Sequence, residues 1–344
     1  MQSQALFSID DRSQIGDARR AAGKMAELLE FDATQAGRVN LAVTECGTNI
    51  LKHAGHGRIL LRGIECDGIG GIEVITLDKG PGIADLNASL RDGQSTSGTM
   101  GGGLGALSRV SSDFQVFTQA GRGTALRMVV WSKPVSDDIP PIEYGGVCLP
   151  KPGEEVSGDG WGVQLYRDQL TVLAADGLGH GVEANLAARA AIEILAQHAR
   201  EDPLALVERC HGALARTRGA AVAVAKLVAS GERGSFAGVG NFVARIEGIP
   251  ASRHLISYNG IVGHSLRKVQ ELAFPWPIGA LLILHSDGIG THWELANYPG
   301  LAARHPALIA AVLYRDYDRG RDDVSVIVLR NRGPRLRNGE PGGS

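Results

Sequence analysis

Residues 174–181 are AADGLGHG, in which an apolar run ends in Asp176 and glycines then occupy positions 177, 179 and 181. Glycine lacks a Cβ atom, so such a run lets other backbone approach the acid closely. Three interpretations fit this pattern: a tight turn, a phosphate-binding loop, or a carboxylate directed at a metal ion. The rest of the chain has to distinguish them, because Asp and Gly are common in ordinary turns.

Three other segments place acids in a similar setting. Asp159 stands between glycines before an apolar run, Asp287 follows the run LLILH, and Asp322 and Asp323 precede the run VSVIVL. Carboxylates without His or Cys partners favour hard ions such as Mg²⁺ or Mn²⁺. Two such ions, ~3.5–4 Å apart, neutralise clustered acids and activate a bridging water for attack on a phosphoester. The repeated strand-end placement favours a metal site over separate Asp-Gly turns.

A second group of motifs precedes residue 132. In NLAVTECGTNILKH, Glu45 and Asn49 are four residues apart and therefore share one stripe of a predicted helix. An amide there suits hydrated Mg²⁺, and the carboxylate can polarise a nucleophile. Taken alone, a surface acid and a surface amide explain the spacing equally well. Asp78 ends an apolar strand and precedes Gly80 and Gly82, which can bring its carboxylate against an adenine amino group.

Glycines also precede the helix expected at 104–112. Gly101, Gly103 and Gly105 lie where backbone N–H groups and the helix dipole favour phosphate. A flexible linker is the alternative, but an amphipathic helix follows immediately. Thr124 opens a later strand, and the P-loop pattern G-x-x-x-x-G-K-[ST] is absent.

The bulk composition is that of a soluble globular protein. The chain has 344 residues, 44% of them hydrophobic and 21% charged, and a net charge of -2. Such a charge gives no general attraction to nucleic acid or to a membrane, so we expect neither as a partner. The four cysteines are scattered, which favours free thiols in a reducing compartment. With no signal peptide and no apolar run of ~20 residues, the expected location is cytoplasmic.

Composition divides the chain into two predicted α+β domains. We expect the first domain at 1–132, a Pro-rich linker at 133–155, the second domain at 156–331 and a flexible tail at 332–344. In the first domain we expect helices that alternate in sequence with the strands of a mostly antiparallel sheet. The second has two strand-rich blocks around two helices, and a late helix near 301–313.

Taken in order, the motifs of residues 1–132 resemble the GHKL ATPase family, which includes histidine kinases, gyrase and bacterial switch kinases that control sigma factors. The stretch DLNASLRDGQSTSGTMGGGLGALSRVSSDF looks most like RsbT-type kinases and their anti-sigma relatives. The resemblance implies a GHKL α/β sandwich, with helices on one face of a mixed sheet, that binds ATP with Mg²⁺. Asn49 would bind Mg²⁺, Glu45 would act as base and Asp78 would read adenine. The phosphates and lid would be framed by Gly80, Gly82, Gly101, Gly103 and Gly105.

The order GD, DGxGHG, SDG, DDxS resembles the SpoIIE branch of the metal-dependent PPM phosphatases, and several segments look like RsbX. That resemblance implies an αββα sandwich holding two Mn²⁺ or Mg²⁺ ions. Asp159 and Asp176 would bridge both ions. The further ligands would be the Gly177 carbonyl, Asp287 and Asp322. Asp323 stands where broader family members carry Asn, so its role is open.

Two kinds of residue near these acids have alternative interpretations. His180 is a proton donor, a ligand, or a hydrogen-bonded cap of the helix that begins near Val182. Arg216 and Arg218 either hold substrate phosphate or form a solvated helix end.

Together these features predict a bifunctional partner-switching regulator, in which a serine/threonine phosphatase is fused to an ATP-binding kinase-like domain. The resemblance implies phosphorylated STAS-domain antagonists or stressosome-type proteins as substrates, and a sigma factor as a further possible partner. In the alternative hypothesis, the first domain binds ATP and sequesters a sigma factor or antagonist without transferring phosphate. A scaffold with an inactive phosphatase is disfavoured because all four metal positions keep their acids.

Overall fold

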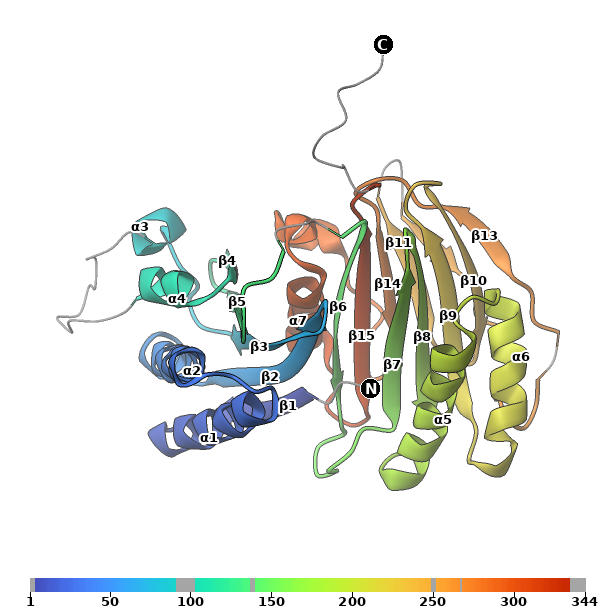
Figure 1. Cartoon of the computed structure of the whole chain (residues 1–344), viewed down its shortest axis with the longest axis horizontal. Coiled ribbons are helices and arrows are strands. Elements are labelled where there is room, and N and C mark those ends of the chain that lie inside the picture. The colour runs from blue at the N-terminus through green and yellow to red at the C-terminus, as the bar shows by residue number, and fades with distance from the viewer. Residues whose placement is uncertain (1–3, 91–102, 137–139, 249–251, 267, 335–344) are drawn as a thin grey trace, which may run out of the picture. The chain divides into compact units, whose positions relative to one another are not determined.

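The structure of the protein is a computed structural model that forms two compact units (Figure 1). The N-terminal unit contains residues 2–136 and 293–316, and the C-terminal unit contains residues 137–292 and 317–344. The residues described are 4–90, 103–136, 140–248, 252–266 and 268–334.

The N-terminal unit is built on one five-stranded sheet with the order β1-β2-β3-β5-β4, in which every pairing is antiparallel. This confirms the predicted α+β class. Its elements are β1 (Gln4–Ile9), α1 (Arg12–Leu28), α2 (Ala33–His53), β2 (Gly57–Cys66), β3 (Ile69–Asp78), α3 (Leu86–Leu90), α4 (Leu104–Val110), β4 (Asp113–Gln119) and β5 (Gly123–Trp131).

Helices α1 and α2 cover the first face of this sheet, where they bury the alternating side chains of β2 and β3, such as Leu61 and Val74. Helix α1 begins at Asp11, which forms a capping box with Gln14. The two helices approach closely at Gly47, where an added Cβ would lie 2.7 Å from Cγ1 of Ile15. Small residues at this crossing therefore set the position of α2.

The second face of the sheet is covered by a segment from much later in the chain. Residues 293–316 belong to this unit and contain η2 (Leu295–Asn297), η3 (Leu301–Ala303) and most of α7 (Pro306–Tyr317). The sequence predicts this stretch within the second domain, 156–331, whereas it packs in the N-terminal unit. Helix α7 is buried from Pro306 to Arg315, and a helix buried along nearly its whole length needs partners on every side.

The C-terminal unit contains two antiparallel five-stranded sheets, with the orders β13-β10-β9-β8-β7 and β12-β11-β14-β15-β6. Its strands are β6 (Ile142–Leu149), β7 (Asp159–Tyr166), β8 (Gln169–Gly177), β9 (Ala220–Val228), β10 (Arg233–Val239), β11 (Val243–Glu247), β12 (Arg253–Leu255), β13 (Leu272–Pro275), β14 (Leu281–His285) and β15 (Val324–Asn331). Its helices are α5 (Val182–His198), α6 (Pro203–Ala213) and the short η1 (Leu214–Arg216).

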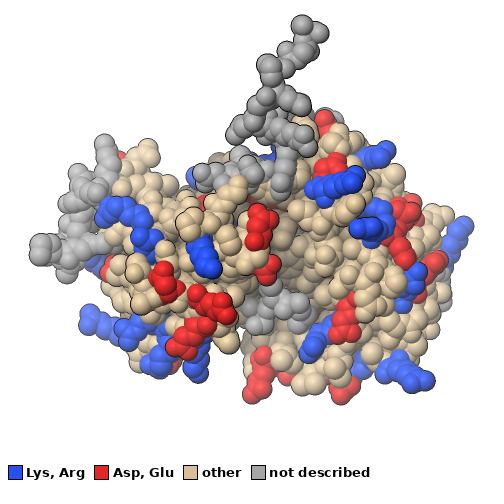
Figure 2. Space-filling model, viewed as in Figure 1, with Lys and Arg blue, Asp and Glu red and all other residues tan. Residues whose placement is uncertain are grey.

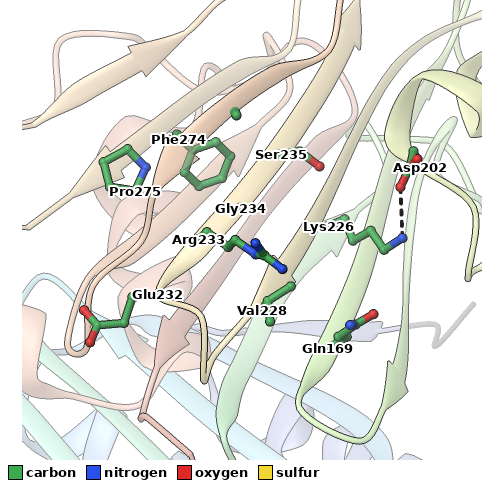
Figure 3. Close-up of a pocket in the computed structure, with 11 residues that line it drawn as sticks. Gln169, Asp202, Lys226, Val228, Glu232, Arg233, Gly234, Ser235, Phe274 and Pro275 are labelled. Carbon is green, nitrogen blue, oxygen red and sulfur yellow. Dashed lines mark hydrogen bonds and ion pairs between the residues drawn. The ribbon is translucent and has the colours of Figure 1, made fainter.

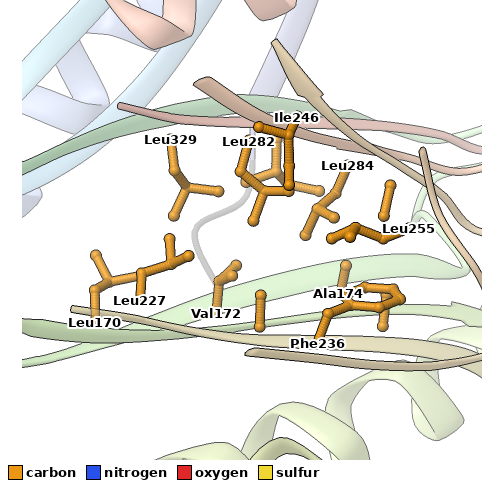
Figure 4. Packing of buried hydrophobic residues seen from close by; sticks show 14 of the residues in the cluster. Leu170, Val172, Ala174, Leu227, Phe236, Ile246, Leu255, Leu282, Leu284 and Leu329 are labelled. Carbon is orange, nitrogen blue, oxygen red and sulfur yellow. The ribbon is translucent and has the colours of Figure 1, made fainter. Parts of the chain in front are cut away.

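Apolar side chains of the two sheets point toward each other, for example Val172 on β8 and Leu284 on β14 (Figure 4). Helices α5 and α6 cover the outer face of the first sheet (Figure 1). Ala187 and Ala191 of α5 pack there with Leu173 of β8. Among the described residues, no helix is both long and apolar enough to cross a membrane.

Strand β6 corrects the prediction that 133–155 is a linker without regular structure. It pairs with β15 along its whole length, from Ile142 opposite Asn331 to Leu149 opposite Val324. Prolines at both ends of this stretch suggested a linker, and the partner strand lies more than 170 residues away in the sequence, so local pattern could not reveal the pairing.

A buried ion network crosses the second face of the N-terminal sheet. Glu73 accepts hydrogen bonds from Arg62 at 2.6 Å and from Arg127 at 2.7 Å, and Arg127 also pairs with Asp113. Burial by itself would raise the pKa of Glu73, but the two guanidinium groups outweigh burial and lower it. The carboxylate is therefore charged at neutral pH, and its contribution to stability is lost only as the pH falls through this lowered value.

We expect Glu73→Ala to lower the free energy of unfolding by about 3–5 kcal/mol at pH 7, because it leaves two buried arginines without their partner. Chemical denaturation measures this change. Glu65→Ala, at an exposed position of the neighbouring strand β2, should change stability by less than about 0.5 kcal/mol. Equal losses in the two variants would contradict a structural role for the network.

Candidate functional site

The first acids of the predicted metal site face each other across two paired strands. Asp159 begins β7 and lies directly opposite Asp176 near the end of β8. The Gly177 N–H donates to the Gly158 carbonyl at 3.1 Å, which holds the two strand ends together. Asp159 is 1% exposed, and neither of its carboxylate oxygens has a hydrogen-bond partner among the described residues. Asp159 is thus buried opposite a second acid without hydrogen bonds to stabilise its charge.

Burial raises the pKa of Asp159 to about 7. The hydroxyls of Ser286 and Ser325 lie close enough to offset part of this rise, although neither makes a hydrogen bond of normal geometry with the carboxylate. Burial also raises the pKa of Asp176, to about 9, and nearby acids raise it further. These acids are Asp159, Asp287, Asp322 and Asp323. The structure therefore brings together the negative charges of all four predicted metal-binding acids.

The remaining acids lie on other strands and loops, and each accepts a hydrogen bond there. Asp287 accepts a hydrogen bond from Nδ2 of Asn241 at 2.7 Å, and Asp322 accepts one from the Asp323 N–H at 3.0 Å. The Lys151 N–H donates to Asp323 at 2.8 Å. In the described part of the chain, no three His, Cys, Asp or Glu side chains stand close enough to one point to hold an ion.

The donor chemistry fits a hard divalent cation. Carboxylate oxygens are the ligands that Mg²⁺ and Mn²⁺ prefer, and buried carboxylates that lack hydrogen-bond donors are stabilised by a cation. The unsatisfied oxygens of Asp159 are the observation that supports this fit.

The glycine loop after Asp176 forms a tight turn, which is one of the interpretations of this stretch and is compatible with a metal-binding Asp176. An added Cβ at Gly177 would lie 2.1 Å from the carbonyl oxygen of Ala184. Gly179 and Gly181 adopt φ values of 91° and 73°, which favour glycine. These residues allow the end of β8 to lie directly against the start of α5.

His180 does not cap helix α5. The N-cap is Gly181, and no side chain makes a capping hydrogen bond there. Instead, Nδ1 of His180 lies 2.6 Å from Oε1 of Glu154. This contact fixes one ring nitrogen and directs the other away from Glu154.

The structure places Arg218, but not Arg216, beside the glycine loop. Nη1 of Arg218 lies 3.1 Å from the position that a Cβ on Gly179 would occupy. The Leu178 N–H donates to the Gly219 carbonyl at 2.9 Å, so the two loops are bonded to each other. Arg216 ends the short helix η1, and no described contact links it to this loop.

Among the predicted nucleotide-binding residues, Asp78 and Thr124 come together. Oδ1 of Asp78 accepts hydrogen bonds from the Gly80 N–H at 2.8 Å and from the Thr124 N–H at 3.1 Å. Glu45 and Asn49 lie half-buried along α2. The two backbone donors fix the carboxylate of Asp78 at the junction of β3 and β5.

The glycines of this site have different structural roles. Gly80 packs on Ala54, where an added Cβ would lie 2.8 Å from the alanine Cβ. Gly82 has a φ of 78° and approaches the Gln119 carbonyl. Gly103 is the N-cap of α4, and Gly105 is buried within that helix. Gly101 lies outside the described residues.

The polar residues that contact the acids were not predicted from the sequence. These are Lys151, Asn241, Ser286 and Ser325. Ser286 and Ser325 stand beside the motif acids in SDG and DDxS, which was the available signal. Lys151 acts through its backbone, so its side chain could not reveal its role.

One cavity of the C-terminal unit is lined by none of the predicted site residues. This cavity of about 640 Å³ lies on the sheet at β9, β10 and β13, lined by Lys226, Arg233 and Phe274 among others (Figure 3). Lys226 forms an ion pair there with Asp202 at 3.0 Å.

Acidic and basic side chains are interspersed on the surface visible in Figure 2, so this view shows no single-sign patch of the kind that binds a polyanion.

Asp176→Asn should stabilise the metal-free protein at pH 8 by at least about 1 kcal/mol. The raised pKa means that the folded protein keeps a proton that the unfolded chain releases above its ordinary pKa of 3.8. Stability of the wild type therefore falls as the pH rises from about 4 toward 9, and the neutral amide removes this loss.

Thermal unfolding in the presence of a chelator measures this effect, and the difference should disappear near pH 4. Asp67→Asn, at an exposed turn, is the control and should leave the pH dependence unchanged. An Asp176→Asn protein that is less stable than wild type at pH 8 would contradict the proposed crowding of charge.

Comparisons with known proteins agree with the two units. The family model of the histidine kinase-like ATPase domain matches residues 8–130. The chain is 33% identical over 131 residues to the serine/threonine-protein kinase RsbT of Bacillus subtilis (strain 168), covering 38% of this chain and 98% of RsbT.

It is also 28% identical over 143 residues to the phosphoserine phosphatase RsbX of the same organism, covering 41% of this chain and 71% of RsbX. A solved structure from work on the bacterial stressosome, as a modular system adapted to control secondary messenger signalling, matches with a TM-score of 0.52 and 28% identity. The match covers 55% of this chain and 99% of that one. The chain therefore belongs, through residues 8–130, to the RsbT family of histidine kinase-like ATPase domains, and another part of it is similar to the phosphoserine phosphatase RsbX.

Proposed function

We propose that the protein is a partner-switching regulator whose C-terminal unit removes phosphate from serine or threonine of a partner protein with Mn²⁺ or Mg²⁺. The observation that carries this proposal is the pair Asp159 and Asp176, which face each other across the ladder, with both carboxylate oxygens of Asp159 buried and without a hydrogen-bond partner among the described residues. Placing such charges together is unfavourable unless divalent cations neutralise them.

Five groups of this chain would hold the two ions. These are the carboxylates of Asp159, Asp176, Asp287 and Asp322, and the carbonyl of Gly177. When bound, the ions would supply a hydroxide at neutral pH and polarise the phosphoester. The chain's own contribution is to hold these oxygens near one another from separate strands and loops, and the charge of the ions would favour their deprotonated form.

Two side chains beside the glycine loop would act on the substrate. The guanidinium group of Arg218 can bind two phosphate oxygens at once. Because Glu154 fixes Nδ1 of His180, Nε2 can give a proton to the serine oxygen as it leaves. The open role of Asp323 becomes a supporting one, since it binds the Lys151 N–H next to the metal-binding acids.

The N-terminal unit is proposed to bind ATP and transfer its terminal phosphate to a serine of the partner. Asn49 would hold Mg²⁺, Glu45 would take the proton of the attacking hydroxyl, and Asp78 would accept a hydrogen bond from the adenine amino group. The fixed position of the Asp78 carboxylate supports this last role.

STAS-domain antagonists and stressosome-type scaffolds are the proposed partners, with a sigma factor as a further candidate. The support is that relatives of both units include a serine/threonine kinase and a phosphoserine phosphatase, and that a similar structure comes from the bacterial stressosome. Joining opposing activities in one chain would set the phosphorylation level of such a partner by their ratio.

Asp159→Asn and Asp176→Asn should each lower Mn²⁺-dependent hydrolysis of a phosphoserine protein or p-nitrophenyl phosphate by about 100-fold or more, because each removes a metal-binding charge. Asp168→Asn, at the other end of the same hairpin, is the matched control and should keep wild-type activity. Hydrolysis that survives both site substitutions would refute the proposed metal site.

Incubation with labelled ATP and a STAS-domain protein separates kinase activity from simple sequestration. If the unit is a kinase, the partner becomes labelled, and Glu45→Gln abolishes labelling while ATP binding persists. Glu27→Gln, on the exposed face of α1, should behave as wild type. Tight ATP binding and partner binding without any label would favour the sequestering alternative.

A further inference from the structure

The segment that covers the second face of the N-terminal sheet is inserted between two of the proposed metal-binding acids. Residues 293–316 follow Asp287 and precede Asp322. The chain enters and leaves the segment through two stretches of the C-terminal unit, residues 288–290 and 317–319, which we call the neck. There the Gly290 N–H donates to the Tyr317 carbonyl at 2.9 Å, and the Arg319 N–H donates to the Gly288 carbonyl at 3.0 Å. Asp287 immediately precedes this neck in sequence, and Asp322 follows it by three residues.

Close to the neck, at its C-terminal end, the segment binds the residue proposed to contact adenine. Nη1 of Arg315 donates to the main-chain carbonyl of Asp78 at 3.2 Å. The side chain of the same Asp78 is held by the Gly80 and Thr124 N–H groups. One residue therefore joins the proposed nucleotide site and the inserted segment, through its carboxylate on one side and its carbonyl on the other.

The position of Arg315 is itself fixed within the segment. Its guanidinium group makes two hydrogen bonds to Asp316, at 2.8 and 3.0 Å, and Tyr298 donates its hydroxyl hydrogen to the same carboxylate at 2.9 Å. Arg315 is 6% exposed. Arg315 is buried and bonded both to Asp78 and, through Asp316, to Tyr298 of the segment. A displacement of Asp78 is therefore passed through Arg315 to the segment.

Further contacts attach the segment along the sheet. The ring of Tyr298 packs on Phe117 with centroids 6.3 Å apart, and Gln119 donates to the Asn297 carbonyl at 3.3 Å. Nη1 of Arg58 on β2 donates to the hydroxyl of Tyr314 at 2.7 Å. Gln119 also lies against the Gly82 turn, where an added Cβ would be 2.7 Å from its carbonyl oxygen. The docking surface thus borders the proposed nucleotide site.

We propose that this sheet face is an internal docking surface for residues 293–316, and that through it nucleotide binding promotes metal binding at the phosphatase site. The inference rests on the proposed function of the two units. Nucleotide bound at Asp78 adds a contact to that residue and, through Arg315, stabilises the docked position of the segment. The docked segment holds the neck, and the neck holds Asp287 and Asp322 in position for the ions. Linkage then requires that metal binding strengthens nucleotide binding by the same factor.

The experiment uses the full chain and first measures ADP binding and Mn²⁺-dependent p-nitrophenyl phosphate hydrolysis separately. Hydrogen exchange then follows the neck peptides, residues 286–292 and 317–323, with and without ADP and Mg²⁺. We expect ADP to slow neck exchange and to raise hydrolysis about five-fold at subsaturating Mn²⁺. The exchange measurement reports coupling without depending on turnover.

Tyr298→Phe and Arg315→Lys should remove the effect of ADP on the neck while leaving ADP affinity and hydrolysis at saturating Mn²⁺ within about two-fold of wild type. Tyr298→Phe keeps the ring and loses only the hydroxyl that holds Asp316, so it tests the network with little risk to folding. Tyr258→Phe is the matched control, because it also removes one hydroxyl hydrogen bond, to Gln270 at 3.0 Å, outside the segment.

Separate measurements distinguish the possible failures. If ADP binds and hydrolysis is metal-dependent but neck exchange does not respond, the coupling is wrong and the proposed function stands. Full coupling in both Tyr298→Phe and Arg315→Lys would likewise overturn the inference. If ADP does not bind, or hydrolysis needs no metal, the proposed function itself fails and the coupling falls with it.

Discussion

The crowding of carboxylates around the paired ends of β7 and β8, where Asp159 is buried, is the constraint on which the C-terminal unit depends. Asp159 and Asp176 are exact partners across the ladder, and Asp287, Asp322 and Asp323 add their charges nearby. Protonation or cations must relieve this charge. Glycines at 158, 177 and 288 let backbone and acids crowd together here, since a Cβ at each would meet another group within 2.7 Å. The local packing therefore concentrates charge that a divalent cation can neutralise.

The N-terminal unit has a different constraint, because both faces of its sheet are covered. Helices α1 and α2 cover one face, and residues 293–316 cover the other. The buried network around Glu73 lies on that second face together with apolar residues such as Leu60 and Ile75. A stretch of chain that lies between two proposed metal-binding acids in sequence thus completes the fold of the unit proposed to bind nucleotide.

Much of the candidate site could be predicted from short-range pattern. The acids at strand ends, the glycine loop after Asp176 and the helix with Glu45 and Asn49 are local signals, because glycine spacing and helical periodicity are encoded over a few residues. The fold class followed from the same periodicities. Strand β6 was not predictable in this way, because the prolines on either side of it indicated a linker. Nor was the packing of α7 against the N-terminal sheet, because a largely apolar helix does not show which surface it packs against.

By itself, the sequence determined the residue types available for chemistry, their order along the chain and the elements that carry them. Only the tertiary structure decided that Asp159 lies opposite Asp176, that Arg218 but not Arg216 reaches the glycine loop, and that Arg315 binds the carbonyl of Asp78. The physical reason is that these contacts join residues far apart in the sequence. Their geometry depends on strand register and on which faces remain to be buried once the local elements have formed.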